Sequence, residues 1–175
     1  MRRRLAAVAL VVVALAAVYW FALRGDSVAP TVTGPYPVAV IGGGSDAVAV
    51  SADGALLTGV SVPEDSELPQ LPLSEPPESG RLAGPMLEQV RVLGAAPAAL
   101  RPYLAGSYYG ESGVDVELTS GIELRFGDAS LAAKKWKAAA AVLADPTITA
   151  LDYVDLHAPS RPATYGSGHI LPPAP

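Results

Sequence analysis

Apolar and polar residues follow three different patterns along this chain of 175 residues. Residues 5–23, LAAVALVVVALAAVYWFAL, are apolar without a charge, Pro or Gly. Between residues 37 and 60, and again between residues 114 and 126, apolar and polar residues alternate with the period of a β-strand. Two further segments carry apolar residues at helical spacing. The pattern predicts a membrane-spanning helix followed by a domain of strands and helices.

The uninterrupted apolar run predicts a single transmembrane anchor. Its nineteen residues, rising about 1.5 Å each, span a hydrocarbon core of about 30 Å. The three Arg of residues 1–4 predict a cytoplasmic N-terminus and an extracytoplasmic remainder. A cleaved signal peptide is the alternative, although its apolar region is usually shorter and ends at a small-residue cleavage site. The residues that mark the anchor are Leu5, Leu15, Leu23 and the interfacial aromatic residues Tyr19, Trp20 and Phe21.

A polar linker over residues 24–36 leads into the first strands of the domain. Asp53 and Gly54 suit a tight hairpin turn, and glycines 42–44 are interpreted as a hairpin turn because no helix follows them, as a nucleotide-binding loop would require. Residues 61–80 are rich in Pro and Glu, so we expect a connector that is neither a helix nor a central strand. Three strands are expected, over residues 37–41, 47–51 and 55–60.

The second part of the domain combines helices with a strand pair. The alternation over residues 114–126 turns the apolar side chains inward and leaves four charged residues facing water: Asp115, Glu117, Glu123 and Arg125. Trp136 marks the apolar face of the last helix. We expect helices over residues 85–93, 97–104 and 130–144, and strands over residues 114–118, 122–126, 148–157 and 161–165, the last at the sheet edge. Residues 166–175 are interpreted as a disordered tail.

Composition and charge restrict the classes of function. Half of the residues are hydrophobic and 17% are charged. Nine of the twelve Lys and Arg and all seventeen Asp and Glu follow residue 23, so this part carries a formal charge of −8. Nucleic acid is therefore not an expected partner, because binding phosphates requires clustered Lys and Arg. The chain has no cysteine, so the domain depends on its core rather than on disulfides.

No group of residues suggests catalysis, a metal site or a cofactor. The sequence lacks HExxH, GxSxG and a cysteine nucleophile, and His157 and His169 are isolated from other metal ligands. Asp152 and Asp155 are three apart on one expected strand, so they point to opposite faces. The strand-turn-helix at Gly127 offers one glycine and a carboxylate, so we interpret Asp128 or Ser130 as a helix cap instead of a phosphate site. We expect a protein that is not an enzyme.

Taken together, the segments resemble the FtsQ/DivIB family of bacterial cell-division proteins over about residues 37–163. The resemblance rests on the basic N-terminus and anchor, on PVAVIGGGSDAVAVSADGALL, on LPQLPL, on VELTSGIELRFGD with the helix KKWKAAAAVLAD, and on LDYVDLHAPSRPA. Two features depart from the family. Only the linker stands where the family carries a POTRA domain, and His157 stands where the family usually has Arg.

The resemblance implies an α+β fold: a transmembrane helix, then a mostly antiparallel β domain over residues 37–165 with two or three helices. It implies a non-enzymatic scaffold at the division septum that holds FtsB-like and FtsL-like membrane proteins and, through them, the septal peptidoglycan synthase. In the family the last strand edge of the β domain receives a segment of FtsB. The matching positions here are Ala163, Thr164 and Tyr165, at an edge where strand addition is physically favourable.

Two other interpretations remain open from the sequence. The runner-up to the scaffold is an envelope-anchored solute-binding or stress-related module with a similar fold, since a fold does not fix a function. A small-molecule pocket would favour this module, and an exposed strand edge without one would favour the scaffold. The third interpretation is a degenerate FtsQ-like paralogue that no longer acts in division.

Overall fold

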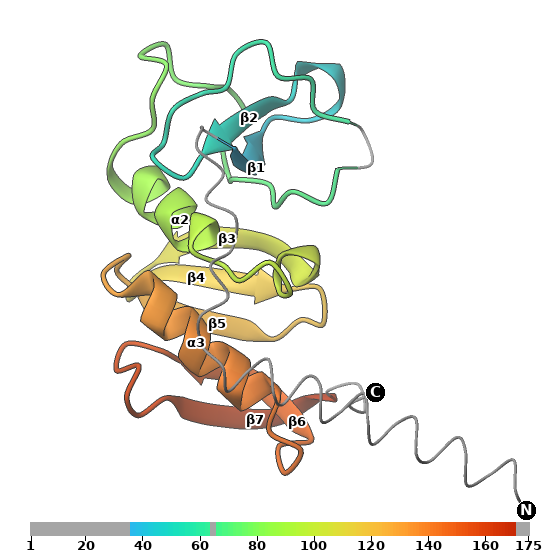
Figure 1. Ribbon diagram of the computed structural model, residues 1–175, viewed down its shortest axis with the longest axis vertical. Helices are drawn as coiled ribbons and strands as arrows, with labels where there is room; N and C mark the ends of the chain where they lie inside the picture. Colours follow the sequence, from blue (N-terminus) through green and yellow to red (C-terminus); the bar gives the residue numbers. More distant parts are fainter. Residues whose placement is uncertain (1–35, 64–65, 171–175) are drawn as a thin grey trace, which may run out of the picture. The chain divides into compact units, whose positions relative to one another are not determined.

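The computed structural model describes residues 36–63 and 66–170 of the chain (Figure 1). The chain divides into two compact units, Met1–Thr33 and Gly34–Pro175, and all described residues belong to the second. Within these residues no helix has the length and apolar character needed to cross a bilayer. The predicted anchor, the cytoplasmic segment before it and the linker up to residue 35 lie outside the described residues.

The described residues form an α+β domain with a mixed sheet. Strand β5 runs parallel to β6, because helix α3 crosses between them, and the other neighbouring strands are antiparallel. A two-stranded ladder contains β1 (Pro37–Ile41) and β2 (Val48–Ser51). A five-stranded ladder has the order β3 (Leu104–Gly110), β4 (Gly113–Leu118), β5 (Glu123–Gly127), β6 (Ala150–Asp155) and β7 (Ala163–Ile170).

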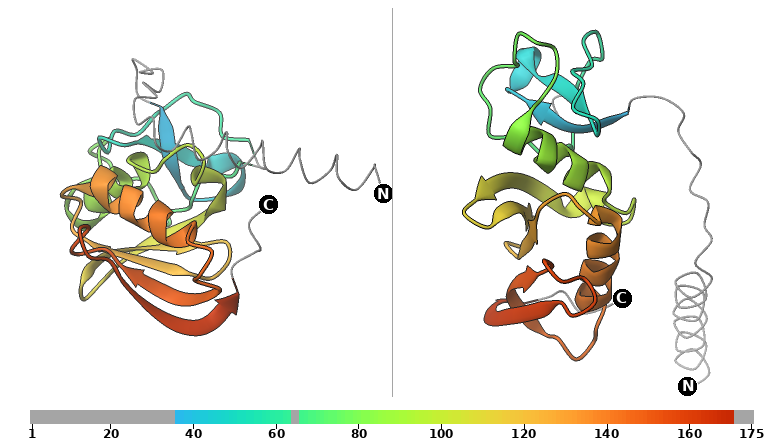
Figure 2. Two further views of the ribbon diagram at one scale, coloured as in Figure 1. Left: turned by 60° about the horizontal axis from the view of Figure 1, so that its bottom comes forward. Right: turned by 90° about the vertical axis from the view of Figure 1, so that its left-hand side faces the viewer.

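Helices α2 (Gly84–Gly94) and α3 (Ala132–Leu143) lie on the same face of the five-stranded ladder (Figure 2). The indole N–H of Trp136 on α3 donates to the carbonyl of Val92 on α2 at 2.7 Å. The ring of Trp136 also packs against Phe126 of β5, with 4.8 Å between ring centroids. One buried aromatic residue therefore joins both helices to the middle of the sheet. Helix α2 extends one residue beyond each end of the predicted range 85–93.

The strand pair at the centre follows the predicted alternation. All six residues predicted to point inward are buried: Val114, Val116, Leu118, Ile122, Leu124 and Phe126. The outward set is partly wrong, because Asp115 is only 7% exposed. Its neighbours in the register are Tyr108 of β3 and Arg125 of β5, and these long side chains shield it from water.

The connector over residues 61–80 contributes more to the sheet than its prolines suggest. Gln70 forms parallel bridges with Val40 of β1 and with Gly106 of β3, so one residue links the two ladders. The adjacent Leu71 is buried in the core. The prediction that this segment contains no central strand position is therefore wrong at Gln70. The bridge to Val40 survives beside the prolines because the carbonyl of Pro69 accepts from the N–H of Val40 and the N–H of Leu71 donates to the carbonyl of Val40.

Several other predicted elements differ from the structure. The strand expected over residues 55–60 is absent from the described sheet, where only Ala55 and Leu56 form single bridges. The helix expected over residues 97–104 is a short 3-10 turn, Arg101–Tyr103. Strand β3 was not expected, because LAGSYYG has no apolar alternation. At the C-terminal end β7 continues to Ile170, so residues 166–170 form part of a strand and not of a disordered tail.

Candidate partner-binding edge

Strand β7 forms one edge of the five-stranded ladder, and the residues predicted to bind a partner lie on it. Ala163, Thr164 and Tyr165 pair with Asp155, Val154 and Tyr153 of β6 on one side. All three are exposed, and Tyr165 is 65% exposed. An edge strand presents unpaired backbone N–H and C=O groups on its free side. The structure therefore brings the three predicted residues together at a position where a further strand can pair.

An aromatic stack between β7 and the neighbouring strand β6 supports this edge. Tyr165 stacks on Tyr153 of β6, with 5.3 Å between ring centroids and an interplanar angle of 25°. The guanidinium of Arg125 on β5 lies 3.7 Å from the centroid of the Tyr153 ring. Rings held in this way have few alternative rotamers, and a cation over a ring adds attraction. The exposed ring of Tyr165 is consequently held in place by Tyr153, which Arg125 contacts in turn.

The stack continues into a charged network on the face opposite the helices. Glu123 accepts hydrogen bonds from Arg125 and from the hydroxyl of Tyr108. Partial burial favours the neutral form of Glu123, but these hydrogen bonds outweigh burial and hold the pKa of Glu123 below its ordinary value. Burial and the hydrogen bond to Glu123 raise the pKa of the Tyr108 hydroxyl. The network fixes Arg125 under the aromatic stack.

Asp115 is the polar group that this network leaves incompletely satisfied. Its Oδ1 is buried and makes no hydrogen bond to the described residues. Burial, with the nearby charge of Glu123, raises the pKa of Asp115. Because a carboxylate needs solvation or hydrogen-bond donors to stay charged, this position disfavours the ionised form of Asp115.

His157 joins the end of β6 to the turn between β3 and β4. Its Nδ1 lies 2.8 Å from Oδ1 of Asp155, and its Nε2 lies 3.2 Å from the carbonyl oxygen of Ser112. Both partners are acceptors, so only the doubly protonated imidazolium donates to both. The hydrogen bond to Asp155 raises the pKa of His157. His157 is thus a structural clamp with a charge that depends on pH.

The turn before α3 is held by a lysine that the sequence pattern did not single out. Lys135 is nearly buried, and its Nζ donates to the carbonyl oxygens of Phe126 at 2.8 Å and Asp128 at 3.0 Å, and to Oδ1 of Asp128 at 2.8 Å. The bond from Lys135 lowers the pKa of Asp128 to about 2. The predicted helix cap is wrong, because the N-cap is Leu131, which has a φ of 54° and makes no side-chain cap bond. Lys135 therefore ties the end of β5 to the turn before α3.

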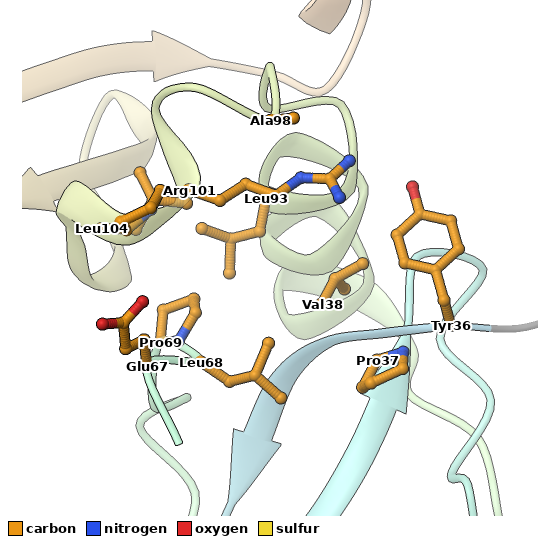
Figure 3. Close-up of a pocket in the computed structure, with 11 residues that line it drawn as sticks. Tyr36, Pro37, Val38, Glu67, Leu68, Pro69, Leu93, Ala98, Arg101 and Leu104 are labelled. Carbon is orange, nitrogen blue, oxygen red and sulfur yellow. The ribbon is translucent and has the colours of Figure 1, made fainter. Parts of the chain in front are cut away.

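One pocket of the described residues lies between β1, the connector and the end of α2 (Figure 3). Its volume of about 240 Å³ lies below the 300 to 1,000 Å³ typical of small-molecule sites. The walls are mainly apolar, with Arg101 on one side and Glu67 on another (Figure 3). Arg101 already packs over the ring of Tyr36 and donates to the carbonyl of Ala96. Arg101 and Glu67 are the charged residues of its lining.

The described residues contain no group of three or more His, Asp and Glu placed to hold a metal. Sequence reasoning found the edge residues but missed the side chains behind them, Tyr153, Arg125 and Tyr108. The alternation placed Arg125 on the outer face of the sheet, which indicated that its side chain could contact neighbouring side chains on that face. The partner ring on β6 could not be found without the register between strands.

An α+β domain with a mixed sheet and an exposed edge at β7 belongs to the class of domains that can bind another chain by strand addition. The family described as "Cell division protein FtsQ/DivIB, C-terminal" matches residues 39–157, which is more than half of the chain, and the protein therefore belongs to this family of cell-division proteins. Comparison with curated proteins gives no match. Strand β7 begins after the matched residues.

Proposed function

We propose that the protein is a non-enzymatic, single-pass membrane scaffold of the division machinery that binds a partner chain along β7. Membership of the FtsQ/DivIB family gives the cell-division role. The observation that carries the binding mode is the position of Ala163, Thr164 and Tyr165 on an exposed edge strand. The partner is an FtsB-like protein, bound together with an FtsL-like protein and, through them, the septal peptidoglycan synthase.

Strand addition explains why small residues suffice at this edge. In such a contact the backbone hydrogen bonds supply affinity, and alternate side chains supply specificity. Ala163 and Thr164 leave the backbone accessible, whereas Tyr165 offers a broad ring for a side chain of the partner. The exposed face of β7 therefore supports pairing with an extended segment better than insertion of a helix.

The proposed topology follows from the sequence. The anchor over residues 5–23 would hold the chain in the plasma membrane with residues 1–4 in the cytoplasm and the β domain outside. Membrane proteins that face the same compartment are the partners that this arrangement makes available. At the septum, the anchor would keep the chain at the membrane, and a partner bound to β7 would be kept there with it.

A binding titration with a peptide from the extracytoplasmic segment of the FtsB-like protein of the same cell tests the binding mode. Thr164→Pro should weaken binding at least tenfold because proline removes a backbone donor and restricts the strand. Thr164→Ala should change the affinity less than twofold. The second arm keeps the domain intact and uses a peptide N-methylated at alternate residues, which should also fail to bind. Equal affinities for both variants and both peptides would contradict strand addition.

The pocket at Arg101 is the observation that favours the solute-binding alternative. A small carboxylate ligand would be the class that Arg101 could recognise. A thermal-shift screen of such ligands against the full chain and Arg101→Ala separates the two functions. A shift that is lost in Arg101→Ala would favour the solute-binding module, and an unchanged melting temperature supports the scaffold.

A further inference from the structure

The two ends of β7 pair differently with β6. Residues 163–165 follow a regular register, in which Tyr165 lies opposite Tyr153. The next pair joins His169 to Leu151, so the single residue Asp152 lies opposite three residues, 166–168. An unequal count of this kind is a β-bulge, which bends the strand and increases its twist.

The bulge is built by Asp152 and two glycines. Oδ1 of Asp152 accepts a hydrogen bond from the backbone N–H of Gly168 at 3.0 Å. A Cβ atom at Gly166 would lie 2.1 Å from Oδ2 of Asp152, and one at Gly168 would lie 2.3 Å from Oδ1. Gly166 also has a φ of 114°, which side chains rarely adopt. The carboxylate therefore occupies the space that a regular β7 strand would need.

We infer that this bulge ends the docking edge at Tyr165 and that the partner is a short extended segment, which pairs with residues 163–165 and leaves the sheet at Gly166. The inference rests on the proposed function, because it describes the partner of the same edge. Bulges on edge strands turn the backbone away from further pairing. A partner strand in register with Tyr165 finds no continuing ladder beyond it.

The short edge defines the kind of partner. Outward backbone groups belong to alternate residues of a strand, so at most two of the three residues can bond to a partner. So few backbone bonds make side-chain contacts necessary for stable binding. Tyr165 is the exposed ring at the end of the pairing segment, and it is held by Tyr153. The fitting segment has few paired residues and an apolar side chain placed to cover Tyr165.

Hydrogen exchange of the full chain in detergent, with and without the FtsB-like peptide, tests the inference. The inference predicts peptide-induced protection at amides within residues 163–165 and no added protection at residues 166–170. Protection that extends through Gly168 to Ile170 would overturn it. If the wild-type chain binds no peptide, the proposed function is overturned. Sedimentation of the chain without peptide then tests separately whether the bulge ends the edge.

A variant that removes the bulge sharpens the test. Deletion of Gly166 and Ser167, combined with Asp152→Thr and Gly168→Thr, places equal numbers of residues on β6 and β7. The longer edge should bind the peptide about tenfold more tightly, with protection past residue 165. Ser167→Ala, which keeps Asp152 and both glycines, should behave as the wild type.

Sedimentation of the same chains provides the arm that needs no peptide. A regular, longer edge is a better template for pairing between copies. The bulge-free variant should therefore associate at lower concentration than the wild type or Ser167→Ala, with circular dichroism used to establish that it has folded. Equal sedimentation of folded variant and wild type would overturn the inference. If the combined variant does not fold, Asp152→Gly, which removes only the carboxylate, takes its place in both assays.

Discussion

In the core between the sheet and its helices, Val116, Leu124 and Trp136 are fully buried, whereas at the β7 edge Ala163 and Tyr165 are exposed. The central strands are fixed by packing against two helices on one face. The edge is fixed by β6 on one side, by the aromatic stack and by one carboxylate in a bulge. The difference separates two tasks: changes at the centre should affect stability, and changes at the edge should affect binding.

The largest effect is expected at the centre. Trp136→Ala removes a fully buried ring together with its bond to Val92, so the free energy of unfolding should fall by about 3 to 5 kcal/mol. Urea unfolding of the full chain in detergent measures the change. Lys137→Ala, one position along on the exposed side of α3, is the control and should stay within about 0.5 kcal/mol. Similar losses in both variants would contradict the assigned core.

A smaller loss of stability is expected on removing the charged side chain of Lys135, which is buried. Lys135→Met retains the apolar stem but removes three hydrogen bonds, so stability should fall by about 1.5 to 3 kcal/mol. Lys134→Met, on the exposed side of the same helix, is the matched control. Chemical denaturation at neutral pH compares the two. A stability of Lys135→Met equal to that of the control would show that the carbonyls near Phe126 do not need the lysine.

At the edge the order of effects should reverse. Tyr165→Ala should lower stability by about 1 kcal/mol, because the ring is mostly exposed and loses only its stacking on Tyr153. Affinity for the FtsB-like peptide should fall about tenfold. Tyr109→Ala removes a comparably exposed ring from β3 and should leave the affinity unchanged. Equal affinities of the two variants would remove the distinction between the edge of β7 and the rest of the surface.

The smallest effect concerns the clamp between His157 and Asp155. The pKa of His157 is raised, chiefly by its hydrogen bond to Asp155, so its contribution is complete below the unfolded value near 6.5 and disappears as pH rises through the folded pKa. The pKa of Asp155 is lowered: burial opposes the shift, and the bonds to His157 outweigh it. The carboxylate's contribution is lost as pH falls through that lowered value. The pair should be strongest between about pH 4 and pH 6.5.

His157→Arg provides the comparison for this clamp, since it keeps a cation at all of these pH values. As pH rises from 5 to 8, the melting temperature of the wild type should decline relative to that of His157→Arg. The corresponding loss in the free energy of unfolding should stay below about 1 kcal/mol, because the pair is partly exposed. His157→Gln should lack the pH-dependent part. Parallel curves for the wild type and His157→Gln would show that the imidazolium does not clamp the turn.

The centre of the fold could be predicted because period and burial coincide there. The alternation of VDVELTSGIELRF identified the six buried apolar residues between positions 114 and 126, and the helical spacing around Trp136 identified α3. The structure corrected Asp115 because exposure also depends on the neighbouring strands. The alternation within β4 contains no information about Tyr108 of β3, which lies opposite Asp115 in the register.

The edge and the connections were harder to predict because non-local contacts determine them. Gly-Ser-Gly at residues 166–168 is typical of a flexible tail, but both glycines lie against the carboxylate of Asp152 and form a bulge within a strand. Gln70 joins two ladders although prolines flank it. Lys135 could not be distinguished from Lys134 and Lys137 by residue type. The predicted edge residues 163–165 came from the family resemblance, and the structure supplied the stack that supports them.

The most direct measurement of the central claim is live-cell imaging of the full chain with a fluorescent protein fused to its N-terminus. The account predicts a band at midcell that forms before constriction begins, with Trp136→Ala lowering the signal through loss of folded protein. A uniform signal around the whole envelope throughout the division cycle, at wild-type protein levels, would contradict a scaffold of the division machinery.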